Sequence, residues 1–387
     1  MNNVVFRDFK RSMVYHSPQY PGYTCWCGLW MMPDSSVMLS FNLFTGPFSG
    51  RDRVSDEIGR LLSWPPAGHK DWYDMTGLEA KRIYLRSTDQ GISWQQVAER
   101  PFKTCINGAV GGGPEVALTD GTILQGIWGP YLPYDDVPRT EYLERSVDGA
   151  KNWSGQEIIY RDKNYRFWAN RLRFLNDGRL VASGAIFPDT PEFQTRDSWA
   201  AAMEPALFVS DDEGNSWDGP IKVLKSKMHS DMVYTEELDF VELDNGDLLI
   251  VLRVEIPGSL DASGVGNRTQ LKLIKSGDTW LSGVEQTTPF PHDGQPELLK
   301  TNEGLIFHIA TGKLFYTSDE GQTWQEMAMP DRLDKIGSKV DSGSGYYPKA
   351  VQLNNGQVLC VGHVGRDNGY GQVDQSITAM RFSIEVV

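Results

Sequence analysis

The 387-residue sequence predicts an all-β chain folded as a six-bladed β-propeller, with seven blades as the alternative. Two observations lead to this fold class. A short pattern ending in Trp recurs at intervals of roughly 40 to 65 residues, and six hairpin-type turns are spread along the chain. A repeat of this length that carries its own turn chemistry is typical of a radial array of small sheets. We interpret residues 1–387 as a single domain of this kind.

The recurring pattern is a Ser or Thr, an Asp two residues later, usually a Gly two further on, and then a Trp. Its copies are STDQGISW ending at Trp94, SVDGAKNW at Trp153, SDDEGNSW at Trp217, TSDEGQTW at Trp324, and the weaker KSGDTW at Trp280. The Asp carboxylate is suited to accept backbone N–H groups of the turn, and Gly takes the positive φ. The Trp is expected to pack the turn against its own blade. The pattern is therefore structural.

Six hairpin turns define the blades. They are the turns at Asp34–Ser35, Asp120–Gly121, Asp177–Gly178, Asn245–Gly246, Glu303–Gly304 and Asn355–Gly356. Each separates two apolar, alternating runs, as in an antiparallel pair, so the sequence predicts six four-stranded antiparallel blades. No further Trp turn follows the last hairpin. The N-terminal VVFRDFKRSMVY is therefore expected to complete the last sheet and close the ring.

Composition excludes some classes of partner. The formal net charge of −14 argues against nucleic acid, which requires clustered Lys and Arg. No apolar run approaches the ~18 residues of a membrane span. The N-terminus lacks the apolar core of a signal peptide, so the protein is either intracellular or has lost a leader. We expect no metal or cofactor, and we expect free buried thiols, because no C-x-x-C spacing occurs among Cys25, Cys27, Cys105 and Cys360.

Counting from the hairpin turns locates a candidate site. The start of the first strand and the end of the second lie at the same end of a hairpin, so both ring one mouth of the central channel. Nine residues before the turn Gly, or Ser35 in the first blade, stand Trp26, Gly112, Ala169, Glu237, Gln295 and Tyr347, and seven residues after it stand Asn42, Trp128, Ala185, Arg253, Thr311 and His363. Ionisable groups at a buried mouth cost free energy unless they are paired or used.

Long connections supply further candidates. The segment between about residues 45 and 79 is far longer than the median loop of roughly five residues, and we expect it to fold over the mouth and contact substrate. It carries His69, Asp71, Trp72 and Tyr73. An imidazole pKa of about 6.5 suits proton transfer at neutral pH, which makes His69 and His363 candidate catalytic residues.

The Trp pattern resembles the Asp box of the sialidase (neuraminidase) superfamily. TEELDFVELDNGDLLIVLR is similar to the sialidase segment in which a Glu opens one strand and an Arg ends its partner, at Glu237 and Arg253. SGSGYYPKAVQLNNG resembles the stretch that carries the nucleophilic Tyr, at Tyr347. The resemblance implies that Glu237 deprotonates Tyr347 and that Arg253 pairs with a substrate carboxylate.

Two arginine positions depart from the sialidase pattern. TCWCGLW replaces the R-I-P motif, and FHIATGKLFYTS lacks the third arginine. Arg171 or Arg173, in FWANRLRFLNDG, is the candidate replacement, with a surface or structural role equally open. The remaining substrate-binding candidates are the aromatic Trp26, Trp128 and Tyr346 and the amides Gln295 and Asn42.

Three functions follow in order of preference. The first is an exo-acting glycoside hydrolase for a terminal acidic or uronate-linked sugar of an oligosaccharide or glycoconjugate. The second is a polysaccharide lyase, in which Arg253 neutralises a uronate and His363, His69 or Tyr347 moves the protons. The third is a glycan-binding propeller without catalysis. The sequence leaves the oligomeric state open.

Overall fold

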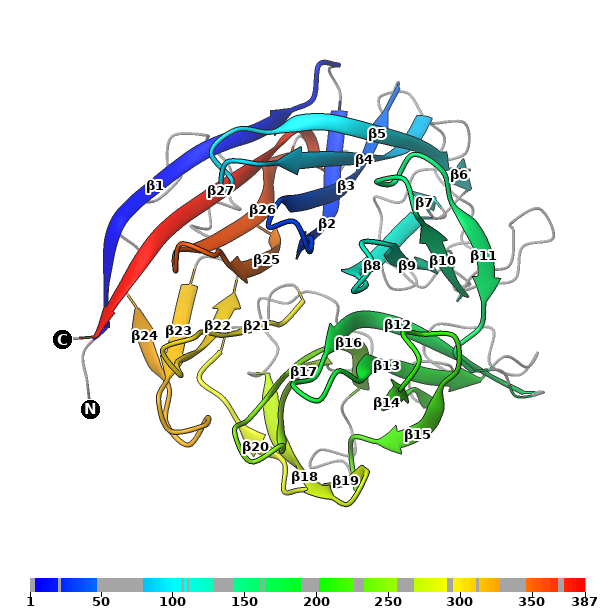
Figure 1. The fold of residues 1–387 in the computed structure, drawn as a ribbon, viewed down its shortest axis with the longest axis vertical. Helices are drawn as coiled ribbons and strands as arrows, with labels where there is room; N and C mark the ends of the chain where they lie inside the picture. The colour runs from blue at the N-terminus through cyan, green and yellow to red at the C-terminus, as the bar shows by residue number, and fades with distance from the viewer. Residues whose placement is uncertain are drawn as a thin grey trace.

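The structure is a computed structural model of the whole chain. It describes residues 4–19, 22–46, 79–102, 104–105, 108–109, 111–128, 142–160, 162, 164–188, 202–225, 233–255, 268–290, 295–310, 313–327, 346–367 and 372–386. These residues form strands and turns arranged as six antiparallel sheets around a central axis, so the prediction of a six-bladed propeller is confirmed (Figure 1).

The first three blades follow one another along the chain. Blade 1 contains β2 (Gly22–Met31), β3 (Val37–Thr45), β4 (Glu79–Ser87) and β5 (Gln95–Phe102). Blade 2 contains β8 (Gly111–Ala117), β9 (Ile123–Trp128), β10 (Tyr142–Ser146) and β11 (Ser154–Glu157), after the small pair β6 (Thr104–Cys105) and β7 (Gly108–Ala109). Blade 3 contains β12 (Tyr165–Phe174), β13 (Leu180–Pro188), β14 (Glu204–Ser210) and β15 (Asp218–Lys222).

The remaining blades close the ring. Blade 4 contains β16 (Val233–Glu242), β17 (Leu248–Glu255), β18 (Thr269–Ser276) and β19 (Thr279–Ser282), with the short β20 (Gln286–Thr287) added to β18. Blade 5 contains β21 (Glu297–Lys300), β22 (Ile306–Ala310), β23 (Lys313–Thr317) and β24 (Gln325–Met327). Blade 6 contains β25 (Tyr346–Gln352), β26 (Val358–Asp367), β27 (Gln372–Val386) and β1 (Val4–His16).

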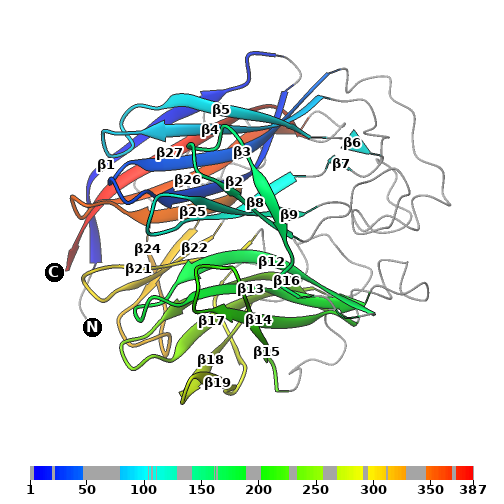
Figure 2. The same ribbon diagram turned by 45° about the vertical axis from the view of Figure 1, so that its right-hand side comes forward.

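The first strand of each hairpin lies nearest the central axis. Figure 1 looks along this axis and shows β2, β8, β12, β16, β21 and β25 around it. The N-terminal strand β1 is the outer strand of blade 6, where Val4 lies opposite Val386 and His16 opposite Ser376. The two termini therefore lie side by side (Figure 2). This pairing leaves no gap between the first and last segments of the chain.

The hairpin turns share one backbone geometry. Gly121, Gly178, Gly246, Gly304 and Gly356 have φ between 81° and 89°, and each donates its N–H to the carbonyl three residues earlier. Ser35 takes this place in blade 1 with a φ of 68°, a region that costs most residues free energy. The common geometry is the reason that counting from these turns aligns the blades.

The Trp turns join neighbouring blades. The Asp319 carboxylate accepts a backbone N–H from Thr323 at 2.9 Å and the hydroxyls of Thr317 and Thr323 at 2.6 and 2.5 Å. Trp324 then donates its indole N–H to Gln270 of blade 4 at 2.8 Å. Trp153 likewise packs against Tyr84 of blade 1. The expectation that each Trp packs on its own blade is therefore incomplete, because these two Trp residues contact the preceding blade.

The core lies between blades. One cluster joins Val181 and Leu207 of blade 3 to Phe240 and Ile250 of blade 4, all nearly inaccessible to solvent. Burying one side chain of this size stabilises the fold by about 1.5–3 kcal/mol. The propeller is thus held together by apolar surfaces between sheets, while the channel carries polar side chains.

Two thiols lie in this interior. Cys27 and Cys360 are buried and unbridged, and burial raises the pKa of Cys27 to about 12. The side chains of Cys25 and Cys105 are outside the described residues. In the described part of the chain, no helix has the length and apolar character needed to cross a membrane.

Candidate active site at the channel mouth

Bulges interrupt the inner strands near the mouth. The register shifts between Cys25 and Gly28 in β2, Gly112 and Glu115 in β8, Ala169 and Arg171 in β12, Tyr234 and Leu238 in β16, and Tyr346 and Lys349 in β25. Trp26 and Tyr347 have φ values of 50° and 46° within their bulges. A bulge breaks the alternation of a strand and changes the direction of a side chain. The bulges therefore lie in the strand segments that contain the predicted site residues.

Strand register places both sets of residues counted from the hairpin turns at one end of the blades. Cys25 lies opposite Asn42, and Tyr346 lies opposite His363. In blade 4 the bulge of β16 faces Arg253, because Tyr234 pairs with Val254 and Leu238 with Leu252. Residues from distant parts of the sequence therefore meet at one mouth.

Three of the predicted residues form a direct cluster. Nη1 of Arg253 lies 2.5 Å from Oε2 of Glu237 and donates to the hydroxyl oxygen of Tyr347 at 3.3 Å. The Tyr347 phenol also lies close enough to Glu237 for this carboxylate to raise the pKa of the phenol. The side chains of Arg253 and Glu237 are only 7% and 12% exposed, so water screens their interaction weakly.

Tyr347 is held as a neutral phenol. Burial raises its pKa above the ordinary value of 10.0, the Glu237 charge raises it further, and Arg253 opposes both effects. A phenol close to a carboxylate can transfer its proton only when the products of that transfer are stabilised. The cluster thus places a potential nucleophile directly beside a potential base.

His363 packs against this phenol. The Tyr347 and His363 rings are stacked with centroids 6.1 Å apart and an interplanar angle of 16°. Burial lowers the pKa of His363 to about 3, so the imidazole is neutral near pH 7. It therefore has no extra proton to donate at that pH.

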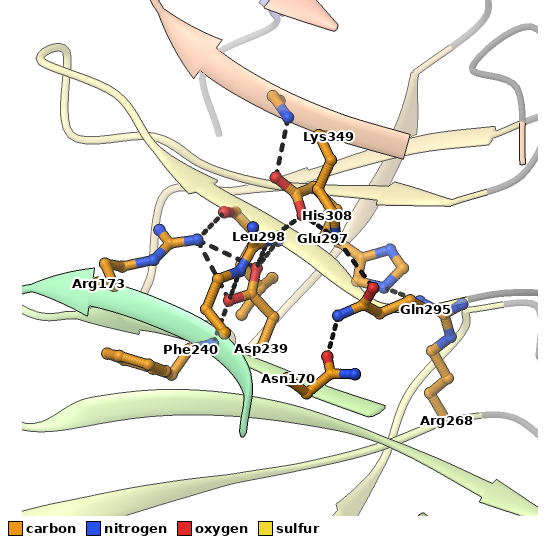
Figure 3. Close-up of polar contacts among 12 residues, drawn as sticks. Asn170, Arg173, Asp239, Phe240, Arg268, Gln295, Glu297, Leu298, His308 and Lys349 are labelled. Carbon is orange, nitrogen blue, oxygen red and sulfur yellow. Dashed lines mark hydrogen bonds and ion pairs between the residues drawn. The ribbon is translucent and has the colours of Figure 1, made fainter. Parts of the chain in front are cut away.

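A second set of charged residues, which we call the deeper set, lies two positions nearer the hairpin turns (Figure 3). Arg171 binds both carboxylate oxygens of Asp239, at 2.9 and 2.7 Å, and contacts Glu297. The Lys349 ammonium lies 3.4 Å from Glu297. Arg173 adds a contact to Asp239 at 3.1 Å. These ion pairs join the inner strands of blades 3, 4, 5 and 6.

The deeper set changes the interpretation of Arg171. Burial lowers the pKa of Arg171, but the carboxylates of Asp239 and Glu297 raise it by more. Burial likewise raises the pKa of Asp239, but Arg171 and Arg173 lower it by more. The guanidinium of Arg171 is therefore engaged within the protein. This geometry favours the structural role for Arg171 over the substrate-binding one.

Blades 1 and 2 have a separate buried network. Arg82 is 1% exposed and binds Glu115 through Nε at 2.8 Å. Its Nη1 donates to Asn42 at 2.8 Å and to the carbonyl of Trp26 at 3.2 Å. Gly28 leaves the space that Glu115 fills, since a Cβ there would lie 2.2 Å from Oε2 of Glu115. This network fixes the backbone at Trp26.

The other predicted residues fall into three groups. Trp26 is partly exposed, with its ring 6.4 Å from that of Phe44. Gln295 and Asn42 are buried and bound to protein groups. His69 and Thr311, and the side chains of Trp128 and Tyr346, lie outside the described residues. Within the described part of the chain, no group of three His, Cys, Asp or Glu side chains is placed to hold a metal ion.

Sequence reasoning missed most of the deeper set although a signal was present. Seven residues before the hairpin Gly stand Arg171, Asp239, Glu297 and Lys349, each on an otherwise mostly apolar strand. Their side chains face one another between the blades, since Arg171 pairs with Asp239 and Glu297, and Lys349 pairs with Glu297. Asn170, the extra residue of the β12 bulge, was missed because counting cannot anticipate a one-residue register shift.

The architecture and mouth define a propeller with a polar channel built from inner-strand bulges. No family model and no curated protein matches this sequence. Among solved structures, the GH93 α-L-arabinofuranosidase of Fusarium graminearum in complex with arabinobiose is similar, with 12% identity over 96% of this chain and 98% of that one and a TM-score of 0.62.

Two further solved structures have a similar fold. A Dyadobacter fermentans protein of unknown function is 15% identical over 99% of both chains, with a TM-score of 0.63. A leech intramolecular trans-sialidase is 11% identical over 97% of this chain and 70% of that one, with a TM-score of 0.56. At these identities the comparisons show a common propeller fold, which also occurs in enzymes that act on carbohydrates.

Proposed function

We propose that this protein is a carbohydrate-active enzyme, an exo-acting glycoside hydrolase that releases a terminal sugar bearing a carboxylate. The observation that carries the proposal is the contact of Arg253 with both Glu237 and the Tyr347 hydroxyl. The similarity of the fold to an arabinofuranosidase and a trans-sialidase supports carbohydrate chemistry.

The proposed first step uses Tyr347 as the nucleophile. The phenol oxygen forms a bond to the anomeric carbon while its proton moves to Glu237. The bond from the anomeric carbon to the glycosidic oxygen breaks, and that oxygen keeps the electron pair and takes a proton from a general acid. We propose His69 as that acid, on the basis of its position in the long segment between β3 and β4.

Water completes the proposed cycle. Its oxygen bonds to the anomeric carbon as the phenol oxygen leaves with its electron pair and recovers the proton from Glu237. The proton released by this water returns to His69, which became a base when it gave up its proton in the first step. Arg253 stabilises the negative charge that develops on the phenol oxygen and holds Glu237 in place. His363 serves as the ring that packs against Tyr347 rather than as an acid.

The charge of Lys349 supports an acidic substrate. Burial and Arg171 lower the pKa of Lys349, so a bound anion would favour its charged form. A neutral phenol also approaches an anionic sugar without the repulsion that a carboxylate nucleophile would meet.

Aromatic side chains complete the proposal. Trp26 lies in its bulge at the mouth, and the sequence places Trp128 and Tyr346 at the same level. We propose that these residues stack on sugar faces.

The test is incubation with oligosaccharides that end in a uronic acid, a sialic acid or a neutral pentose, followed by mass spectrometry. Hydrolysis gives products whose masses add up to substrate plus water, and we expect this result for an acidic terminus. Products that add up to the substrate alone identify β-elimination and the lyase alternative. Binding without products from any sugar identifies a glycan-binding propeller.

A further inference from the structure

A chain of three side chains crosses the channel from blade 6 to blade 3 (Figure 3). The Lys349 ammonium donates to Oε1 of Gln295 at 2.9 Å. Nε2 of Gln295 then donates to Oδ1 of Asn170. Lys349 and Gln295 are 7% exposed, and Asn170 is partly exposed.

The donors and acceptors of this relay have one consistent direction. The ammonium of Lys349 can only donate, so the oxygen of Gln295 must face it. The nitrogen of Gln295 therefore faces Asn170, which must present its oxygen in return. The side-chain nitrogen of Asn170 is left pointing away from Gln295, as Figure 3 shows.

The backbone places Asn170 at the bulge of β12, the counterpart of the bulges that contain Glu237 and Tyr347. Asn170 is the extra residue of the β12 bulge, since the register shifts between Ala169 and Arg171. Its neighbour in the relay, Gln295, stands at the same counted position as Glu237 and Tyr347. An amide nitrogen carries two N–H donors and no acceptor.

We propose that Asn170 is a substrate-contacting residue that donates a hydrogen bond to an acceptor oxygen of the bound sugar, and that Lys349 and Gln295 orient it. This inference rests on the proposed function, because it assigns one substrate contact of the same site. The acceptor oxygen belongs either to a carboxylate or to a hydroxyl. Gln295 is then a positioning residue rather than the direct binding residue expected from the sequence.

The orientation can be tested without substrate. Side-chain amide signals of Asn170 and Gln295 are compared by NMR in the wild type, Lys349→Met and Gln295→Met. In Lys349→Met, we expect both signals to shift and the Gln295 amide protons to exchange at least about tenfold faster, because their partner is no longer fixed. In Gln295→Met, the Asn170 signals should shift.

A surface lysine supplies the matched control. Lys313 is 47% exposed and pairs with Glu326, so Lys313→Met removes a charge without touching the channel. It should leave both amide signals unchanged. The proposed orientation is overturned if the signals in Lys349→Met and Gln295→Met are the same as in the wild type.

The contact is tested with Asn170→Asp. Aspartate keeps the oxygen that accepts from Gln295 but replaces the free N–H donors by a second oxygen. Binding of D-glucuronic acid and D-xylose is measured by calorimetry, because the two pyranoses differ in the carboxylate. We expect the variant to weaken glucuronic acid binding by about ten- to a hundredfold.

The two sugars distinguish the acceptor. A loss for glucuronic acid alone places Asn170 beside the carboxylate, which the added charge of aspartate also repels, and an equal loss for both sugars assigns the contact to a hydroxyl. Unchanged affinities in Asn170→Asp, or no binding of either sugar by the wild type, overturn the contact. The proposed function fails separately, if the wild type cleaves no oligosaccharide or if Tyr347→Phe cleaves the same oligosaccharide as the wild type.

Discussion

Arg253 and Glu237 come from adjacent strands of blade 4, and a single guanidinium nitrogen of Arg253 contacts both Glu237, at 2.5 Å, and Tyr347 of blade 6, at 3.3 Å. The contact spans the channel, since β16 and β25 belong to different blades. It depends on two bulges, because Glu237 and Tyr347 both lie where the inner-strand register shifts. Loss of either contact would separate the phenol from its electrostatic partner.

Arg253→Lys should lower kcat/KM by about ten- to a thousandfold, corresponding to about 1.4–4 kcal/mol of transition-state stabilisation. Lysine keeps the charge, but its side chain is one bond shorter and lacks the guanidinium, so it cannot hold one nitrogen against both partners. The measurement is steady-state kinetics on a cleaved oligosaccharide. Arg145→Lys is the control, because Arg145 makes a two-point contact with Glu157 in blade 2, on the outer strands β10 and β11. Equal effects of the two substitutions would contradict the special role of Arg253.

His363 should make stability depend on pH. Its folded pKa is about 3, below the ordinary value of 6.5, because burial disfavours the charged ring. Below about pH 6.5 the unfolded chain takes up a proton that the folded protein does not, so the free energy of unfolding falls as pH falls toward 3, by up to ~1.4 kcal/mol per pH unit. The pKa of buried His308 is also lowered, which adds to the slope.

The measurement is urea unfolding at several pH values between 7 and 5. His363→Phe keeps a ring against Tyr347 and should reduce the slope by about one proton. His16→Phe, at an exposed position of β1, is the control. An unaltered slope in His363→Phe would contradict the buried neutral imidazole.

Asp319→Ala should lower the free energy of unfolding by ~1–3 kcal/mol, because the carboxylate holds a backbone N–H and two hydroxyls of its turn. Asp319→Asn keeps the size and one acceptor and should cost less. Chemical denaturation measures both. If the two variants were as stable as the wild type, the repeated turn would not stabilise the junction of blades 4 and 5.

His69→Ala should reduce kcat by about a hundred- to ten-thousandfold, the range typical of a general acid. The effect should be smaller for substrates whose leaving group is already acidic, since such a group needs no proton. Kinetics on aryl glycosides with leaving groups of different acidity measure this dependence. An equal loss for every leaving group would contradict the acid role of His69.

The periodic turns allowed most of the fold to be predicted. Gly246 and Gly356 fix the level of two blades, so counting from them led to Arg253 and Tyr347 at one mouth. The partners across the channel were harder to predict. Whether a charged inner-strand residue such as Lys349 faces a carboxylate or a ligand depends on packing between blades, which no local pattern contains. The position of Asn170 could not be predicted either, because it depends on a bulge that shifts the register by one residue.

The most direct test of the account is the turnover of Tyr347→Phe on an oligosaccharide that the wild type cleaves. Only the hydroxyl that contacts Glu237 and Arg253 is lost, so the fold should be retained. If Tyr347 is the nucleophile, kcat falls by at least about a thousandfold, or ~4 kcal/mol, while Tyr316→Phe, whose hydroxyl binds Gln325 in blade 5, stays near the wild-type rate. A Tyr347→Phe protein that cleaves the substrate at the wild-type rate would contradict the assignment of Tyr347 as the nucleophile.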